Sequence, residues 1–258
     1  MKQNRQTHTR QRGFTLIEMM TVLLILGIVS AGLFSVISTA QQRAYSEQVK
    51  LDNFQEARDF VDQFFRDINQ IGYPSSRMID PTAAWSPALD TSALLTYTWA
   101  SPYVNDNRMA VGLVKIDANE IQFEGDMNGD GVIQSVMYQI NGSGNCTLCL
   151  QRSQADKVIG DTLTGQTKNW GTEVNDVIST PIFTYFQADG TQITVPQDIS
   201  TLAGAQALAS VKTIRVALLI RNNAVLDVKS GQPIETTFQG EVSLNNCSMA
   251  ASGQTMSC

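Results

Sequence analysis

Histidine is nearly absent from this 258-residue sequence, and its single copy, His8, lies in a short basic segment at the N-terminus. A chain that loses this segment contains no histidine at all. Such a chain cannot build the Ser-His-Asp or Cys-His systems that activate nucleophiles, nor a metal site with histidine ligands. Asp126 and Asp130 could be imagined as a hydrolytic pair, but no second acid–base constellation stands out. The sequence therefore does not predict an enzyme.

Positive charge is scarce outside the first 13 residues. That segment contains Lys2, Arg5, Arg10 and Arg12 and no acidic residue. The whole chain has 18 Lys and Arg and 24 Asp and Glu, so the remainder keeps 14 basic against 24 acidic residues, a net charge of −10. A body of this charge repels phosphate backbones, so we do not expect it to bind nucleic acid.

One apolar run, residues 14–37, has the length of about 20 residues that a helix needs to cross a bilayer. Because the basic segment before it stays in the cytoplasm by the positive-inside rule, the rest of the chain is expected outside. Ser35 to Ala40 gives only a weak site for a signal peptidase, so the run is expected to stay attached as a membrane anchor.

Glu18 interrupts the apolar run near its start. A carboxylate at this depth costs a few kcal/mol, so it is expected to have a partner or a function. A simpler interpretation is that Glu18 lies at the membrane interface and extends its carboxylate to the headgroups.

The residues around Glu18, Arg-Gly-Phe-Thr-Leu-Ile-Glu from Arg12 to Glu18, resemble the processing site of type IV prepilins. The resemblance implies that residues 1–13 are a leader, and that prepilin peptidase cleaves between Gly13 and Phe14 and methylates the new N-terminus of Phe14. It also implies that Glu18, the fifth mature residue, guides assembly. Its carboxylate can pair with the Phe14 amine of a neighbouring subunit, where each charge offsets the desolvation of the other.

The helix is expected to continue beyond the membrane as an amphipathic half, residues 38–73, and to end at Gly72-Tyr73-Pro74. From Phe14 to Ile71 it would be about 87 Å long. Apolar residues recur every three or four positions on one face, which is expected to cover a core: Phe54, Ala57, Val61, Phe64, Ile68 and Ile71, widened by Phe60 and Phe65. Charged residues are expected on the other face: Lys50, Asp52, Glu56, Arg58, Asp59, Asp62, Arg66 and Asp67.

The end of this helix, with Arg66-Asp67-Ile68 and Gly72-Tyr73, resembles minor pilins of the PilW type. That resemblance implies a structural subunit that primes assembly of a type IV pilus or lies at its tip. Its expected partners are other minor pilins, the major pilin, prepilin peptidase and the inner-membrane assembly platform. The subunit would wait in the inner membrane with a periplasmic head and become extracellular with the pilus. A J-type minor pseudopilin of a type II secretion system is the main alternative, and a signal-anchored envelope enzyme a more distant one.

Residues 74–258 are expected to form the head, which begins with a loop-like region as far as Tyr103. Short β-rich segments separated by tight turns indicate an antiparallel sheet, and residues 198–210 a short helix. The fold class is therefore α+β, a pilin fold in which the long helix packs on the sheet. The predicted strands are 109–116, 120–124, 132–140, 147–152, 182–187, 212–221 and 236–244.

A turn in the head resembles a calcium-binding loop. Asp126, Asn128 and Asp130 alternate before Gly131, and Val132 can offer its carbonyl oxygen, a pattern that gathers hard oxygen ligands at one point. The twelfth position is Met137 instead of the glutamate of an EF-hand, so another ligand such as Glu124 would be needed. The same residues also form a plain hairpin turn without metal.

Four cysteines, Cys146, Cys149, Cys247 and Cys258, are expected to be oxidised in an envelope compartment. We favour the pairs 146–149 and 247–258, the second of which resembles the C-terminal disulfide loop of many pilins. The first pair requires a turn between Asn145 and Cys149, because the two Cα atoms would be about 10 Å apart in a strand. The other two connectivities remain open, and neither a redox role for Cys-Thr-Leu-Cys nor a four-cysteine zinc site is favoured.

Overall fold

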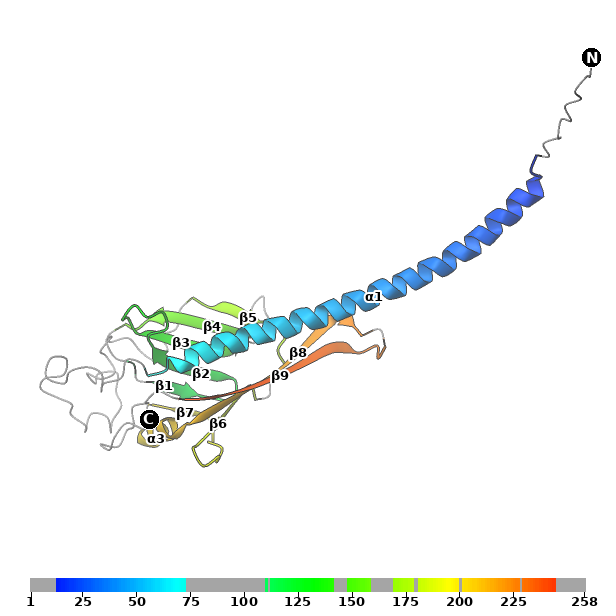
Figure 1. Ribbon diagram of the computed structural model, residues 1–258. Coiled ribbons are helices and arrows are strands. Elements are labelled where there is room, and N and C mark those ends of the chain that lie inside the picture. Colours follow the sequence, from blue (N-terminus) through cyan, green and yellow to red (C-terminus); the bar gives the residue numbers. More distant parts are fainter. Residues whose placement is uncertain are drawn as a thin grey trace, which may run out of the picture.

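The computed structural model describes residues 13–72, 110, 112–141, 148–158, 169–178, 181–199, 201–227 and 229–244. It confirms the α+β arrangement: a long N-terminal helix is followed by antiparallel sheets, as in a pilin fold (Figure 1). The loop-like region predicted up to Tyr103 lies outside the described residues, and so do Cys146, Cys247 and Cys258.

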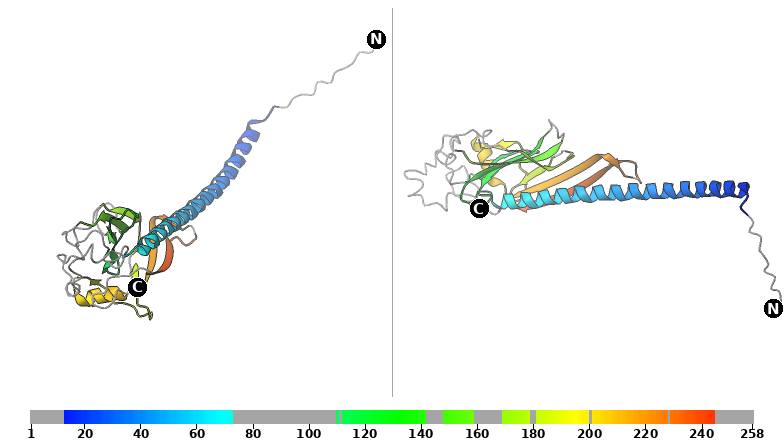
Figure 2. Two further views of the ribbon diagram at one scale, coloured as in Figure 1. Left: turned by 60° about the vertical axis from the view of Figure 1, so that its left-hand side comes forward. Right: turned by 90° about the horizontal axis from the view of Figure 1, so that it is seen from above.

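Helix α1 spans Leu16–Asn69, which is 54 residues, or about 81 Å. It begins two residues later than predicted, because Thr15 is extended and caps it, and Gln70 is its C-cap. Figure 2 shows the helix extending far beyond the head as a single rod. Its apolar N-terminal part is long enough to cross a membrane, and no residue of that window is buried against the rest of the chain.

The strands form two antiparallel sheets. The larger has the order β5-β4-β3-β2-β1-β7 and the smaller the order β6-β8-β9. Short helix α3, Leu202–Ser210, is capped by Thr201. In chain order the strands are β1 (Leu113–Ile116), β2 (Glu120–Gly125), β3 (Gln134–Asn141), β4 (Cys149–Asp156), β5 (Gly171–Val174), β6 (Phe183–Phe186), β7 (Gln197–Asp198), β8 (Thr213–Leu226) and β9 (Pro233–Ser243).

Each predicted strand corresponds to an observed one, with ends displaced by a few residues. Strands β5 and β7 were not predicted, because each has four residues or fewer and lies at the edge of the larger sheet. Asp198, predicted as the first residue of a helix, belongs to β7 instead, and the helix begins four residues later.

Helix α1 packs its C-terminal half against both sheets, between β3–β5 on one side and β8–β9 on the other (Figure 1). The predicted apolar face is confirmed, and it surrounds Tyr138 of β3 with aromatic rings. Phe54 departs from the prediction, since it is 46 % exposed and its ring contacts Phe238 at the edge of this face. The buried residues of this face are Ala57, Phe60, Val61, Phe64, Ile68 and Ile71.

The prediction that Asp67 lies on the polar face of α1 is wrong, because its side chain is buried among the sheet residues instead of facing solvent. It lies three residues after Phe64 and seven after Phe60, which places it on the same side of the helix as these two rings. The carboxylate can be buried at this position because polar side chains of the sheet form hydrogen bonds with it.

Candidate functional site

The N-terminal end of α1 is an exposed, capped helix start. Gly13 and Phe14 precede the helix, and the Phe14 side chain is 81 % exposed. No neighbouring atom lies within 4 Å of the place where a Cβ of Gly13 would be. The described part of the chain therefore leaves both residues of this bond exposed.

Glu18 forms a capping box with Thr15. The Glu18 amide donates to Thr15 Oγ1 over 3.3 Å, and Glu18 Oε2 accepts from the Thr15 amide over 2.9 Å and from its hydroxyl over 3.0 Å. The carboxylate thus satisfies donors at the helix start that hydrocarbon could not satisfy. In the single subunit the Glu18 carboxylate therefore accepts its hydrogen bonds from the start of its own helix.

The comparison with protein families agrees with this geometry. The family model of the prokaryotic N-terminal methylation motif matches residues 8–34, from the basic segment into the apolar half of α1. The N-terminal segment is that of a type IV pilin-like prepilin. No curated protein and no solved structure matches the chain. The motif implies processing by prepilin peptidase and attachment to the membrane, and it points to a pilin-type structural protein.

The finer features predicted at this end of the prepilin remain predictions. They are the cleavage between Gly13 and Phe14, the methylation of Phe14 and the pairing of Glu18 with a neighbouring subunit. The capping box adds one constraint to them, because any new partner of the Glu18 carboxylate has to share it with Thr15 or displace Thr15.

A buried polar cluster, formed by Asp67, Tyr138 and Arg152, joins α1 to the larger sheet. Asp67 Oδ2 accepts from the Tyr138 hydroxyl over 2.7 Å and from Arg152 Nε over 2.8 Å, and Arg152 Nε also lies 3.0 Å from the Tyr138 oxygen. Gln63 Nε2 donates to Asp67 Oδ1 over 2.7 Å. Burial, reinforced by the charge of Asp67, raises the pKa of Tyr138 well above its ordinary value. The phenol therefore stays a neutral donor.

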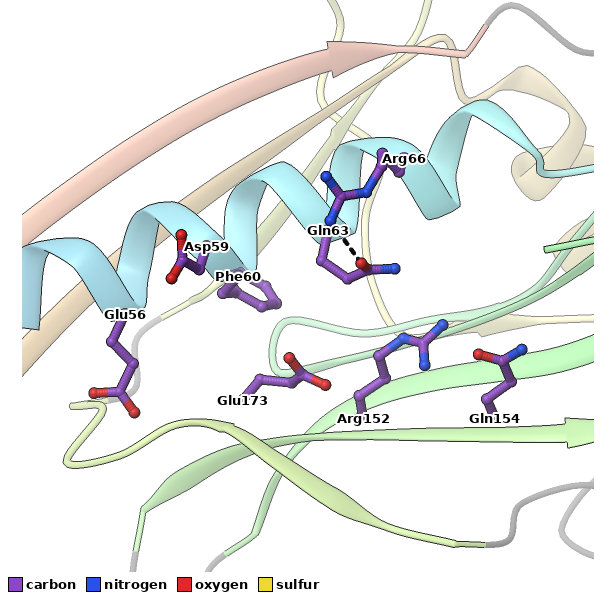
Figure 3. Close-up of a pocket in the computed structure, with 8 residues that line it drawn as sticks. All are labelled: Glu56, Asp59, Phe60, Gln63, Arg66, Arg152, Gln154 and Glu173. Atoms are coloured by element: carbon purple, nitrogen blue, oxygen red, sulfur yellow. Dashed lines mark hydrogen bonds between the residues drawn. The ribbon is translucent and has the colours of Figure 1, made fainter. Parts of the chain in front are cut away.

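Above this polar cluster lies an open cleft of about 510 Å³ between α1 and strands β4 and β5 (Figure 3). Carboxylates gather at one end, where Glu56 accepts from the backbone and side-chain amides of Asn175. Arg152 and Arg66 lie toward the other end, and Arg66 donates to Gln63 over 2.7 Å. Burial raises the pKa of Glu173, and the nearby Arg152 partly offsets that effect.

The cleft has charge of both signs but shows no set of groups typical of an active site. Among the described residues that line it there is no cysteine, serine or threonine. Within the described part of the chain, no group of three or more His, Cys, Asp or Glu side chains is arranged to hold a metal ion. The residues present can form ion pairs and hydrogen bonds with a neighbouring surface.

The predicted calcium loop brings its residues into one turn. Asp126 Oδ1 accepts from the Gly129 amide over 2.7 Å and Oδ2 from the Gly131 amide over 2.9 Å. Asp130 Oδ1 accepts from the Val132 amide over 2.8 Å, and Asn128 Nδ2 donates to Asp130 Oδ2, also over 2.8 Å. These bonds are those of a self-supporting turn, and calcium binding stays a prediction.

Glu124, suggested as a supporting calcium ligand, is engaged elsewhere. Its Oε2 atom accepts from Lys157 Nζ over 2.7 Å, and the two side chains are 1 % and 0 % exposed. A carboxylate in this ion pair faces the interior of the head, so a calcium ion in the loop would have to take its remaining ligand from another group. Nothing in the sequence pattern pointed to Lys157 as the partner.

Of the four cysteines, only Cys149 lies among the described residues, at the start of β4. It is disulfide-bonded, and its partner falls outside them. Leu148, directly before it, lies in a turn with a left-handed φ of 66°. A chain reversal at this point is what the 146–149 pairing requires, and the pairing itself stays a prediction.

Proposed function

We propose that this prepilin is a minor pilin that primes assembly of a type IV pilus or lies at its tip. The observation that carries the proposal is the division of α1 into two parts. Its first half is apolar, and no residue of its membrane-length window is buried against the described part of the chain, whereas its second half is built into the head. A bare apolar helix that leaves the bilayer can bury its surface only against other such helices, and a filament core offers them.

The C-terminal end of α1, which packs in the head, supports the minor-pilin assignment. The Arg66-Asp67-Ile68 sequence on which the resemblance to PilW-type pilins rests has a structural role, since Asp67 joins the buried polar cluster and Ile68 lies in the core. The head beyond it, residues 74–258, is large for a subunit whose only task is to repeat along a filament.

A J-type minor pseudopilin of a type II secretion system is the alternative, since it would share the processing site, the helix and the strand-rich head. The two functions are distinguished by deleting the chain from its host. A minor pilin predicts loss of surface pili with secretion unchanged, whereas a pseudopilin predicts retained exoproteins in the periplasm with pili unchanged.

Two substitutions test the role of Glu18 in assembly, because one keeps the capping box and the other removes it. Glu18→Gln keeps the box, because glutamine also caps from this position, but it removes the charge. Glu18→Ala removes both. If the carboxylate pairs with the Phe14 amine of a neighbour, both variants are processed normally but are missing from sheared filaments.

Normal incorporation of Glu18→Gln together with loss of Glu18→Ala would show that capping alone matters, and would contradict the pairing. Asp52→Ala is the matched control, since Asp52 is an exposed acid of the same helix outside the apolar run. Intact-mass analysis with and without prepilin peptidase reports processing: it should show loss of residues 1–13 and a methyl group on Phe14. Retention of the leader in both strains would overturn the prepilin assignment of the whole chain.

A further inference from the structure

The tip of the β8–β9 hairpin lies against α1 on the side of the head that faces the apolar half of the helix (Figure 1). An ion pair fixes it there, because Asp227 Oδ2 lies 2.8 Å from Lys50 Nζ. The other oxygen of Asp227 accepts from the amides of Lys229 and Ser230, each over 2.9 Å. The position of the tip along the helix is therefore defined.

A groove of about 550 Å³ separates the hairpin tip from α1. Lys50 is neutralised inside it by Glu47 and Asp227, at 3.0 and 2.8 Å. Arg43 and Lys229 also line the groove, and in the described part of the chain no carboxylate oxygen lies within 4 Å of either. Two uncompensated positive charges thus lie at one place on a chain whose mature form has a net charge of −10.

One end of this groove, at Arg43, is close to the expected membrane surface. Arg43 follows the end of the apolar run, Ile37, by six residues, or about 9 Å of helix. The polar headgroup layer is about 5–8 Å thick on each side of a bilayer, so Arg43 lies at its outer edge. Residues 38–46 contain no acid, and the first one, Glu47, is paired with Lys50.

Two exposed side chains flank the groove residues in the sequence and suit an interface. Tyr45 is 61 % exposed on α1, and Leu226 is 54 % exposed where β8 ends. Tyrosine is enriched at the headgroup level of membranes, and an apolar side chain beside basic residues is typical of surfaces that lie on a bilayer.

We propose that Arg43 and the hairpin tip, with Lys229 and Leu226, form a docking surface for anionic phospholipid headgroups of the membrane that holds α1. This inference rests on the proposed function, because it requires α1 to span the membrane before assembly. The contact orients the head: the basic tip rests on anionic lipid, while the acidic remainder of the head is repelled from it. The subunit then waits in one orientation instead of tumbling about its anchor.

Photo-crosslinking to lipid tests the proposal. The full chain, with Leu226 replaced by p-benzoylphenylalanine, is reconstituted into vesicles of equal parts phosphatidylcholine and phosphatidylglycerol, irradiated, and analysed by intact mass. We expect lipid adducts in which phosphatidylglycerol exceeds phosphatidylcholine by at least about fivefold, because about 1 kcal/mol for each basic residue near a membrane is a factor of about five. The ratio of phosphatidylglycerol to phosphatidylcholine adducts should fall toward one in high salt.

Charge reversal identifies the residues. Lys229→Glu and Arg43→Glu should each abolish the excess of phosphatidylglycerol adducts. Arg58→Glu should leave it unchanged, because Arg58 lies about 31 Å of helix beyond Ile37, more than a Debye length from the bilayer. A photoreactive residue in place of the exposed Thr237 of β9 is the matched position that should give no lipid adduct.

The outcomes separate this inference from the proposed function. Flotation of the chain with the vesicles reports insertion by itself, and failure to float would contradict the membrane anchor on which both depend. Flotation without lipid adducts at position 226, adducts in proportion to lipid composition, or adducts only to a second copy of the chain would each overturn the docking surface and leave the anchor intact.

Discussion

Removing Arg152 should loosen the attachment of α1 to the head. In Arg152→Ala the carboxylate of Asp67, which is 4 % exposed in the parent, keeps its bonds to Tyr138 and Gln63 but loses the one cation that pairs with it among the described residues. Breaking a buried ion pair in this way costs about 3–5 kcal/mol. Arg152 lines an open cleft from which water can enter, so we expect the lower end, about 3 kcal/mol. For a domain of this size, that lowers Tm by about 6–12 °C.

Companion variants make this prediction specific to the buried polar cluster. Tyr138→Phe removes the hydroxyl that bonds to Asp67 and Arg152, and should cost about 1.5–3 kcal/mol. Replacing both charges, in Asp67→Leu with Arg152→Met, should cost less than the sum of the two single variants, because no charge is then left buried alone. Arg66→Ala is the matched control, since Arg66 is an exposed arginine of the same cleft.

Urea unfolding of the full chain in detergent, followed by near-ultraviolet circular dichroism of the head, measures these differences. Two results would refute the reasoning. One is a change below about 0.5 kcal/mol for Arg152→Ala, which is the range of an ordinary surface substitution. The other is strict additivity of the two single variants, which would mean that Asp67 and Arg152 do not depend on each other.

Three further predictions concern separate parts of the head. Gly240→Ala should destabilise it, because the new Cβ would lie 2.9 Å from Cζ of Phe65, and a lower urea midpoint would show this. If residues 126–130 bind calcium, the chain should melt higher with calcium than with chelator, and an unchanged midpoint leaves only the turn. The hydrogen bond from Lys50, followed by those from the backbone amides, holds the pKa of Asp227 far below its ordinary value. Its stabilising effect is therefore complete above the ordinary pKa of about 4 and is lost as pH falls through the lowered one; Asp227→Asn should remove that part of the acid dependence. A pH profile of unfolding identical to that of the parent would contradict this assignment.

The long helix and most strands could be predicted because their signals are local. Hydrophobic residues at helical spacing identified the face of α1 that covers the sheets, and Gly72 with Pro74 placed its end within a few residues. Strands β5 and β7 escaped prediction, because four and two residues are too few for alternation to emerge. They are defined by the neighbours they pair with, and those neighbours are distant in the sequence.

The N-terminal methylation motif could be predicted from the sequence because it is one short linear segment. The buried polar cluster could not, since its three members come from α1, β3 and β4. A signal did exist for Asp67: its spacing from Phe60 and Phe64 places it on the buried face, and charge alone suggested the opposite. No comparable signal exists for the Glu124–Lys157 pair, because strand alternation does not reveal which distant side chain meets another across the interior.

The unbroken helix also determines how the molecule bears force. Helix α1 crosses the head lengthwise and is held there by side chains distributed from Lys50, which pairs with the hairpin, to Asp67 near its end. Tension applied to the apolar half runs along the helix axis, so it slides these contacts parallel to the interface and loads them all at once. Contacts loaded in shear must rupture together, whereas contacts pulled perpendicular to the interface open one after another. When a subunit is pulled out of a bilayer by its helix, the force therefore acts along the helix axis. This is the direction in which the head is hardest to detach from α1.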